Sequence, residues 1–525
     1  MACMSRGAIT APRNIDAWWR YGLPGLLATG LMSLGSLGVG WLPLRTTVIE
    51  WPIVESLRAT GPGLITSHIL VFTGIAVLLQ TWLLLGRALA PDESRRMTTR
   101  DLIAIVSMWS FPLLFAAPLF SRDVYSYYTQ GRLMIEGYDP YTTGVSVLPG
   151  WFQDGVDPMW AESPTPYGPL FLLLSRGVAD FSFEQPAFAA LVFRLLAVLG
   201  VILLLIYVPR LAFAHGIDPT RAVWLAVANP LVILHFVAGA HNDALMVGFV
   251  VMGLTMAVER RPLVGAIAIA LAASVKPIAL LALPFVGLVW AGRNARWWDR
   301  IRAWLATGVT AAVAFGLTAI IAGVGLGWIL ALGTPGEVRT WLSPPTAIGM
   351  FLGGGAQAIG IAETNDAFVN VARLLGAIAA VTIVAWLILS PWRRSPVRNA
   401  AWAFLAVVLL GPVVQPWYLL WILPLFAVTG VTARSLRVII VATAGFCIHA
   451  MSESLATSDT VFEFSDGLGI IIAVVIVGGI LFISPRERNL ILDQDIAGGL
   501  TPVDAPARAR ARQWTDQPPW QDAGS

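Results

Sequence analysis

Apolar segments long enough to cross a lipid bilayer recur along almost the whole of this sequence, and this feature constrains the fold most strongly. A spanning helix needs about 20 mostly apolar residues. The chain has 525 residues, of which 57% are hydrophobic and 12% are charged, whereas soluble globular proteins carry about 25% charged residues. So little charge cannot give a chain of this length a water-facing surface. We therefore expect an all-α polytopic membrane protein.

The apolar segments also predict how the chain is organised. One stretch, 263–291, is long enough for two short helices, because Pro277 removes a backbone donor and kinks or ends a helix. We expect about fourteen membrane-spanning helices, with about twelve as the lower estimate, and further helices in the extracytoplasmic loops. The membrane domain would cover 22–484, between an N-terminal segment 1–21 and a disordered tail 485–525 that is rich in Pro, Ala and Arg. The other candidate spans are 22–42, 64–86, 102–120, 187–208, 220–238, 244–258, 303–323, 368–389, 400–414, 418–433, 437–450 and 467–483.

Arginine predicts the orientation, because cytoplasmic loops are enriched in basic residues. Most of the arginines fall in alternate gaps between the candidate spans and at the two ends of the chain, whereas acidic residues gather in the long gap 121–186. We predict that both termini are cytoplasmic and that 121–186 is an extracytoplasmic loop. The net charge is +3 and the basic residues are dispersed, which argues against nucleic acid as a partner.

The loop 121–186 carries the first candidate for chemistry. Asp123 lies within a few residues of the end of an apolar span, so it should sit at the membrane surface. A carboxylate there could act as general base on a sugar hydroxyl presented from outside. Equally, Asp123 could cap the next helix or pair with Arg122. Position alone does not separate these interpretations.

Two further outer motifs are polar. Gly137-Tyr-Asp-Pro-Tyr and Pro166-Tyr-Gly-Pro have turn chemistry that shapes a loop, although their tyrosines could also stack on sugar rings. His241-Asn-Asp could bind sugar hydroxyls or phosphate, or could be an interfacial turn that starts a helix. The chain has only five histidines and none lies at ligand spacing from His241, so we expect no metal site.

Lys276, the single lysine of the chain, stands inside an apolar stretch just before Pro277. An ionisable group in such a stretch is costly and is by default a functional-site hypothesis. A lone ammonium suits a phosphate as a point charge. The alternative is that the side chain reaches to the membrane interface.

Two more outer segments complete the predicted face. Arg339 would be a second cation on the side that is poor in arginine, suited to an anionic head group. The aromatic residues of these segments could belong to the interfacial aromatic belt. They are Trp341, Trp417 and Tyr418. Together, a carboxylate, two cations, amides and aromatic rings on one face indicate an enzyme that acts on a lipid-linked anionic substrate.

The motifs in their order resemble the bacterial polyprenyl-phosphate-mannose-dependent alpha-1,6-mannosyltransferases of the MptA/MptB family, and the resemblance covers about 20 to 485. Two of them, Trp341-Leu-Ser-Pro-Pro and Val414-Gln-Pro-Trp-Tyr, are closer to MptB. Asp243 stands where the family commonly has Glu, so the charge is kept. The remaining motifs that carry the resemblance are Ser121-Arg-Asp-Val-Tyr-Ser-Tyr, Gly137-Tyr-Asp-Pro-Tyr, Pro166-Tyr-Gly-Pro-Leu-Phe, Asn229-Pro-Leu with His235, Gly239-Ala-His-Asn-Asp, Val275-Lys-Pro and Gly325-Leu-Gly-Trp.

The resemblance implies a GT-C glycosyltransferase fold with an extracytoplasmic active site in the plasma membrane. The donor would be polyprenyl-phosphate mannose and the acceptor a lipid-anchored alpha-1,6-mannan, the backbone of lipomannan and lipoarabinomannan, with no cofactor and no metal. Asp123 matches the position of the catalytic base, and Lys276 and Arg339 would bind the donor phosphate. The residues expected to bind sugar or acceptor are Tyr127, Asp139, Tyr141, Tyr167, His241, Asn242, Asp243, Trp341, Gln415, Trp417 and Tyr418.

Two alternatives remain open at this point. Another GT-C transferase of the same envelope could use polyprenyl-phosphate arabinose or glucose, since no residue identifies the sugar. A lipid-sugar flippase or transporter is the second alternative, and it should place its charges around the bilayer midplane between helices.

Overall fold

The computed structural model describes residues 15–89, 97–331, 333, 336, 338–390 and 395–455. These residues form helices and connecting loops, with no β-strand among them. The α-helices are α1 (Ile15–Ala17), α2 (Leu23–Val39), α3 (Pro52–Ala59), α4 (Gly61–Ala88), α5 (Thr99–Ser110), α6 (Asp123–Ile135), α7 (Pro169–Phe181), α8 (Pro186–Ala214), α9 (Pro219–Ala226), α10 (Asp243–Val258), α11 (Pro262–Val275), α12 (Leu283–Ala291), α13 (Trp297–Ala322), α14 (Trp328–Ala331), α15 (Pro344–Ala358), α16 (Asp366–Leu389), α17 (Pro396–Leu410), α18 (Leu419–Thr429) and α19 (Ala433–Leu455).

Six helices in this part of the chain are long and apolar enough to cross a membrane. Shorter apolar helices accompany them, among them α11 and α17. The prediction of a polytopic all-α membrane protein agrees with this arrangement, whereas the predicted number of about fourteen spans is not confirmed. The predicted span 467–483 and the predicted tail 485–525 lie outside the described residues. The six helices are Ile15–Val39, α4, α8, α13, α16 and the 433–451 part of α19.

The predicted helix break at Lys276-Pro277 is confirmed. α11 ends at Val275, and Lys276 has an extended backbone with φ −144° and ψ 116°. A 3-10 helix, Pro277–Ala282, then leads into α12. The proline lacks the amide that would continue the α-helical ladder, so the chain leaves the helix one residue before it. The break presents the Lys276 side chain at a helix end instead of within a continuous helix.

A second break lies before α10. The chain forms a π-helix over Val232–Ala238, and this helix is bent by 114° relative to α10. Ala240, in the turn between them, has a positive φ of 53°, which is an uncommon and strained conformation for a residue with a Cβ. Arg194 of α8 holds the end of the π-helix by donating hydrogen bonds to the carbonyl oxygens of Val237 at 2.9 Å and Ala238 at 3.2 Å.

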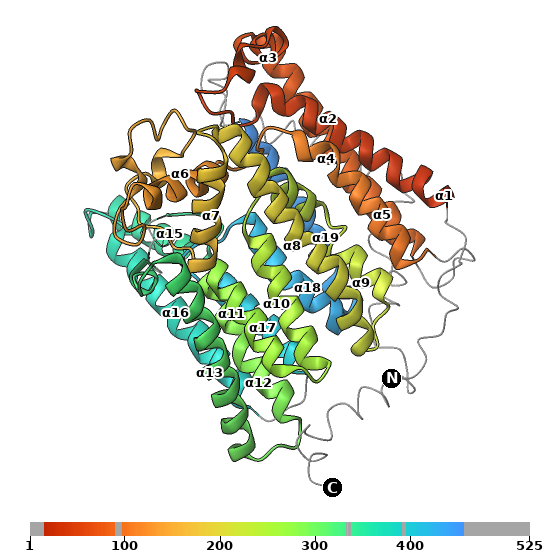
Figure 1. The fold of residues 1–525 in the computed structure, drawn as a ribbon, viewed down its shortest axis with the longest axis vertical. Helices are drawn as coiled ribbons and strands as arrows, with labels where there is room; N and C mark the ends of the chain where they lie inside the picture. The colour runs from red at the N-terminus through yellow and green to blue at the C-terminus, as the bar shows by residue number, and fades with distance from the viewer. Residues whose placement is uncertain are drawn as a thin grey trace.

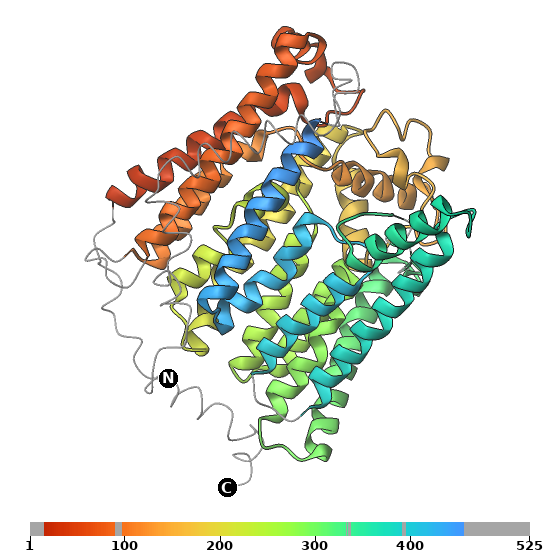
Figure 2. The same ribbon diagram turned by 180° about the vertical axis from the view of Figure 1, so that it is seen from behind.

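Figure 1 shows how the helices frame the predicted loop 121–186. α8, α10 and α18 run through the middle of the molecule, with α2, α4 and α5 on one side and α11, α13 and α16 on the other. α6 and α7 belong to the loop segment, and they lie beside α15 at one end of the bundle in both views (Figures 1 and 2). The loop is therefore largely helical and covers one end of the central helices.

Candidate functional site

A cavity of about 450 Å³ opens beneath the loop segment. Its walls come from the start of α6, the loop 157–167 between α6 and α7, the break after α11, and the segment 413–418. Sequence positions more than 290 residues apart thus meet at one place. Of the predicted site residues, those that line the cavity are Asp123, Tyr167, Lys276, Gln415, Trp417 and Tyr418.

Asp123 is the first residue of α6, and its side chain is 21% exposed. Its Oδ2 lies 3.4 Å from Nδ1 of His241, and its backbone amide donates a hydrogen bond to Ser121 Oγ at 3.1 Å. Arg122 has other partners, because its guanidinium donates to the carbonyl oxygens of Gly155 and Val156, both at 2.8 Å. The Asp123 carboxylate is therefore held between the cavity and an imidazole, and not by the neighbouring arginine.

The electrostatic surroundings keep this carboxylate ionised. Burial alone would raise the pKa of Asp123, but the hydrogen-bonding contact with His241 and the charge of Lys276 outweigh it, so that the pKa lies below its ordinary value. The carboxylate is thus in the form that accepts a proton at neutral pH. Such a group at a cavity wall meets the first requirement for a general base.

Buried aromatic rings fix the imidazole behind Asp123. The side chain of His241 is fully buried and stacks on the indole of Trp417, with 3.9 Å between ring centroids. His235 packs against the same indole at 5.6 Å. Trp417 itself lines the cavity, so one of its faces supports the imidazole. Sequence reasoning placed His241 on a sugar-binding surface, and the structure places it one layer behind the cavity wall.

Lys276 forms a buried ion pair beside the cavity. Its Nζ donates to Oδ1 of Asp243 at 2.9 Å, with 14% of the lysine side chain and 1% of the aspartate side chain exposed. Nε1 of Trp421 donates to the same oxygen at 2.7 Å. The ammonium also lies 5.4 Å from the ring centroid of Tyr418 and 5.1 Å from that of Trp421, within the range of cation–π attraction. Asp243 thus holds Lys276, which faces the cavity.

Several predicted sugar-binding residues have other surroundings. Tyr127 packs edge-on against Phe171, with 4.8 Å between centroids. Asp139 accepts a hydrogen bond from the backbone amide of Tyr141 at 2.9 Å, and the Tyr141 hydroxyl donates to the carbonyl oxygen of Tyr167 at 3.1 Å. These contacts agree with the interpretation in which the motifs at Gly137 and Pro166 shape the loop. Asn242 is buried within the turn before α10.

The second predicted cation lies apart from the cavity. Arg339 donates to Oδ1 of Asn365 at 2.7 Å and forms an ion pair with Asp366, at the start of α16. Both charged side chains are largely exposed, at 41% and 53%. Trp341 is 64% exposed. The structure therefore brings Lys276 to the cavity of Asp123 and places Arg339 at the start of α16, so that the two cations predicted to bind the donor phosphate do not line one cavity.

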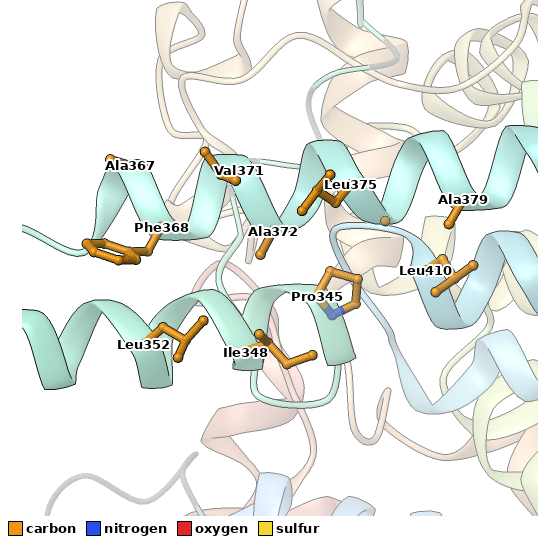
Figure 3. A pocket seen from close by; sticks show the side chains of 11 residues that line it. Pro345, Ile348, Leu352, Ala367, Phe368, Val371, Ala372, Leu375, Ala379 and Leu410 are labelled. Atoms are coloured by element: carbon orange, nitrogen blue, oxygen red, sulfur yellow. The ribbon is translucent and has the colours of Figure 1, made fainter.

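A second cavity, of about 550 Å³, lies between α15 and α16 (Figure 3). Ile348 and Leu352 of α15 face Phe368 and Leu375 of α16, and Leu410 at the end of α17 closes one end. Its lining is apolar throughout. No side chain in this lining can transfer a proton or bind a sugar hydroxyl, so the first cavity is the candidate active site.

Sequence reasoning missed three side chains at the site. Trp421 donates to Asp243 and was read only as part of an apolar span. Ser126 and Gln130 line the cavity. They stand three and seven residues after Asp123, a spacing that puts side chains on one face of a helix. Reading 123–135 as a helix would have found both.

The fold and the site together define a helical membrane protein with a carboxylate, an ammonium and aromatic rings around one cavity. Among the described residues, no group of three or more His, Cys, Asp or Glu is placed to hold a metal ion. Comparison with known proteins identifies the class more closely. A family model described as alpha-(1->6)-mannopyranosyltransferase, N-terminal domain, matches residues 22–292, and a model of the MptB C-terminal domain matches residues 345–483.

The curated relatives agree with the family models. The chain is 34% identical to alpha-(1->6)-mannopyranosyltransferase A of Mycobacterium tuberculosis, over 79% of this chain and 81% of the relative. It is 28% identical to alpha-(1->6)-mannopyranosyltransferase B of Corynebacterium glutamicum, over 88% and 81%. The chain belongs to the MptA/MptB family of alpha-(1->6)-mannopyranosyltransferases, and this membership supports mannosyltransferase activity. No solved structure matches the chain.

Proposed function

We propose that the protein is an inverting mannosyltransferase that moves mannose from polyprenyl-phosphate mannose to the alpha-1,6-mannan backbone of lipomannan and lipoarabinomannan precursors. The observation that carries this proposal is the shared cavity, in which the carboxylate of Asp123 and the ammonium of Lys276 face the same space. Glycosyl transfer from a lipid phosphate needs a base for the acceptor hydroxyl and a cation for the phosphate that leaves. The names of the curated relatives support mannose as the sugar.

Lys276 is the residue that receives the leaving phosphate in this proposal. An ammonium has three N–H donors, and one of them is used on Asp243. The other two remain for phosphate oxygens, on which negative charge grows as the glycosidic bond breaks. Donors fixed in place before the reaction stabilise such developing charge most effectively. Asp243 and Trp421 fix the lysine, so the ammonium need not reorganise.

Asp123 takes the proton from the attacking acceptor hydroxyl. In the free protein, the charge of Lys276 is one of the influences that lower the pKa of Asp123. An anionic phosphate at Lys276 would offset this charge and so raise the pKa of the carboxylate. Donor binding would therefore make Asp123 a better base when the acceptor is to be activated.

The stereochemistry follows from a single displacement. The donor carries a β-linked mannose and the product an α linkage, so one in-line attack inverts the anomeric carbon. No enzyme nucleophile takes part. The proton moves to Asp123, and the polyprenyl phosphate departs with the electrons of the broken bond. A cavity with a base on one wall and a cation on another fits this arrangement.

We further propose a GT-C type fold with the site on the extracytoplasmic face and both termini in the cytoplasm. The support is the distribution of arginine along the sequence. Tyr138, in the loop after α6, is 46% exposed, and Cys447 is buried. In intact cells, a Tyr138→Cys variant should therefore react with a membrane-impermeant maleimide. Labelling only after the cells are broken open would contradict this orientation.

The reaction itself is tested by transfer from defined donors. Purified protein receives polyprenyl-phosphate mannose, arabinose or glucose, each labelled in the sugar, with a short alpha-1,6-mannoside acceptor. We expect an elongated labelled product from the mannose donor, and its cleavage by an alpha-1,6-specific mannosidase. A product formed from arabinose or glucose alone would contradict the choice of donor, and binding of the donor without any transfer would favour a flippase.

A further inference from the structure

A row of polar side chains runs along one face of α6. Asp123, Ser126 and Gln130 are spaced by three and four residues, which places them one above the other on a helix, and all three line the cavity. With a rise of about 1.5 Å per residue, the row extends about 10 Å along the helix axis. This length exceeds a single pyranose ring.

Two members of this row have unsatisfied polar atoms. Ser126 is 5% exposed and Gln130 is 8% exposed. Ser126 Oγ and Gln130 Oε1 have no hydrogen-bond partner in the described part of the chain. Buried polar atoms are nearly always paired, and each exception calls for an explanation. Here both residues line the cavity, so a bound molecule can supply the missing partners.

Thr129 of the same helix does not line the cavity, and its hydroxyl has a partner within the helix. Its hydroxyl donates to the carbonyl oxygen of Tyr125 at 2.5 Å, the usual arrangement for a hydroxyl within a helix. Ser126 is equally able to make such a bond to the preceding turn and does not make one. Its hydroxyl is therefore left for a partner from outside the chain, and the residue lines the cavity.

The chemistry of the row indicates a neutral ligand rich in hydroxyl groups. Ser126 and Gln130 carry a hydroxyl and an amide, and neither carries charge. The anionic phosphate has its own partner in Lys276, which enters from the break after α11. Trp160, in the short 3-10 helix Pro158–Trp160, also lines the cavity and offers an aromatic ring of the kind on which sugars stack.

We propose that Ser126 and Gln130 form a subsite for the acceptor sugar that precedes the reacting one, so that the enzyme extends an existing mannan in preference to a single mannose. The acceptor lies along α6, with its reacting hydroxyl at Asp123 and its penultimate sugar at Ser126 and Gln130. This inference rests on the proposed function, because the reacting end of the acceptor lies at Asp123 only if Asp123 is the base.

The test compares acceptors of two lengths. Wild-type protein, Gln130→Leu, Gln130→Glu and Ser126→Ala are assayed with a mannoside and with an alpha-1,6-dimannoside, at a fixed concentration of polyprenyl-phosphate mannose. The measured quantity is the ratio of kcat/KM for the two acceptors. Thr129→Val is the matched control, because it removes a hydroxyl of α6 that does not line the cavity.

We expect the wild type to prefer the dimannoside and Gln130→Leu to lose about tenfold of that preference, because transfer to the dimannoside falls more than transfer to the monosaccharide. Gln130→Glu keeps an acceptor oxygen and should retain most of the preference, Ser126→Ala should lose part of it, and Thr129→Val none. An elution profile like that of the wild type on size-exclusion chromatography shows that each variant is folded.

Three outcomes would overturn the subsite. Gln130→Leu could keep the wild-type ratio, it could lower transfer to both acceptors equally, or the wild type could show no preference. In each of these cases the wild type still transfers mannose, and the proposed function stands. Absence of transfer by the wild type to either acceptor would overturn both proposals.

Discussion

The cavity beneath α6 and the region around α15 and α16 both contain a cation that the sequence predicted to bind phosphate, and they differ in how that cation is held. Lys276 is largely buried, paired with a buried aspartate, and faces a cavity that also contains Asp123. Arg339 is exposed and paired with the exposed Asp366. The cavity near it is lined by apolar side chains.

This comparison teaches that the position of a charge in the sequence is a weaker guide than its surroundings. A buried ion pair is costly to assemble, and here its lysine lines the same cavity as Asp123. An exposed ion pair contributes little and needs no functional reason. The burial of Lys276 therefore indicates a functional role. The following experiments test the difference between the buried Lys276 and the exposed Arg339.

The largest effect is expected at the carboxylate. Asp123→Asn keeps the shape of the side chain and removes its basicity, so kcat/KM for mannosyl transfer should fall by about 10²- to 10⁴-fold. Asp157→Asn is the matched control, since Asp157 lines the same cavity and caps the 3-10 helix at Met159, a role that asparagine can fill. An equal loss in the two variants would remove Asp123 from the role of base.

The two cations should respond differently to the same substitution. Lys276→Met removes the partner of the leaving phosphate and should lower kcat/KM by about 10²- to 10³-fold, whereas Arg339→Met should change it by less than about twofold. Because Lys276→Met leaves Asp243 buried and unpaired, the double variant Lys276→Met/Asp243→Asn is measured as well. Recovery of activity in this double variant would show that Lys276 is not needed for the leaving phosphate. A large loss of activity in Arg339→Met would show that Arg339 takes part in the reaction.

The pH dependence tests the contact between Asp123 and His241. The pKa of Asp123 lies below its ordinary value of 3.8, and the ionised form is active, so activity should fall only as the pH drops through this low pKa. The His241→Gln variant lacks the imidazole that lowers the pKa of Asp123 against the effect of burial. The pKa of Asp123 should therefore rise, and the acid limb of the pH profile of kcat/KM should move to higher pH. His215→Gln, at the end of α8, serves as the control. An acid limb that stays in place would show that His241 has no influence on the base.

The smallest effect is expected from removal of metal ions. The acidic groups of the site already have cationic or aromatic partners, as Asp243 does in Lys276 and Trp421. Transfer should therefore proceed at the same rate in excess EDTA. A loss of activity that Mg²⁺ or Mn²⁺ restores would show that the acidic side chains of the cavity bind a cation during the reaction.

The sequence predicted those features of the molecule that depend on local pattern. Apolar runs predicted a helical membrane protein, and Pro277 predicted the break that presents Lys276. The motif order predicted the family. Asp123 and Lys276 were singled out because a charge within or beside an apolar segment stands out against its neighbours.

The remaining features depend on contacts between distant segments. Asp243 and Trp421 are 178 residues apart, and no periodicity in either segment indicates that they meet. Arg339 and Lys276 look alike in sequence, since each is a lone cation on the side predicted to be poor in arginine. Only the fold distinguishes them, because it buries one beside a carboxylate and leaves the other exposed. Ser126 and Gln130 were overlooked because the helices expected in the outer loops were not assigned to residue ranges, so the spacing from Asp123 was not used.

The most direct test is a structure of the protein with a non-reactive phosphonate analogue of polyprenyl-phosphate mannose, determined by electron cryomicroscopy. The account predicts phosphonate oxygens within about 3 Å of Lys276 Nζ, a hydrogen-bond distance, and a mannose ring in the cavity that contains Asp123. A phosphonate bound at Arg339, with its sugar between α15 and α16, would contradict it.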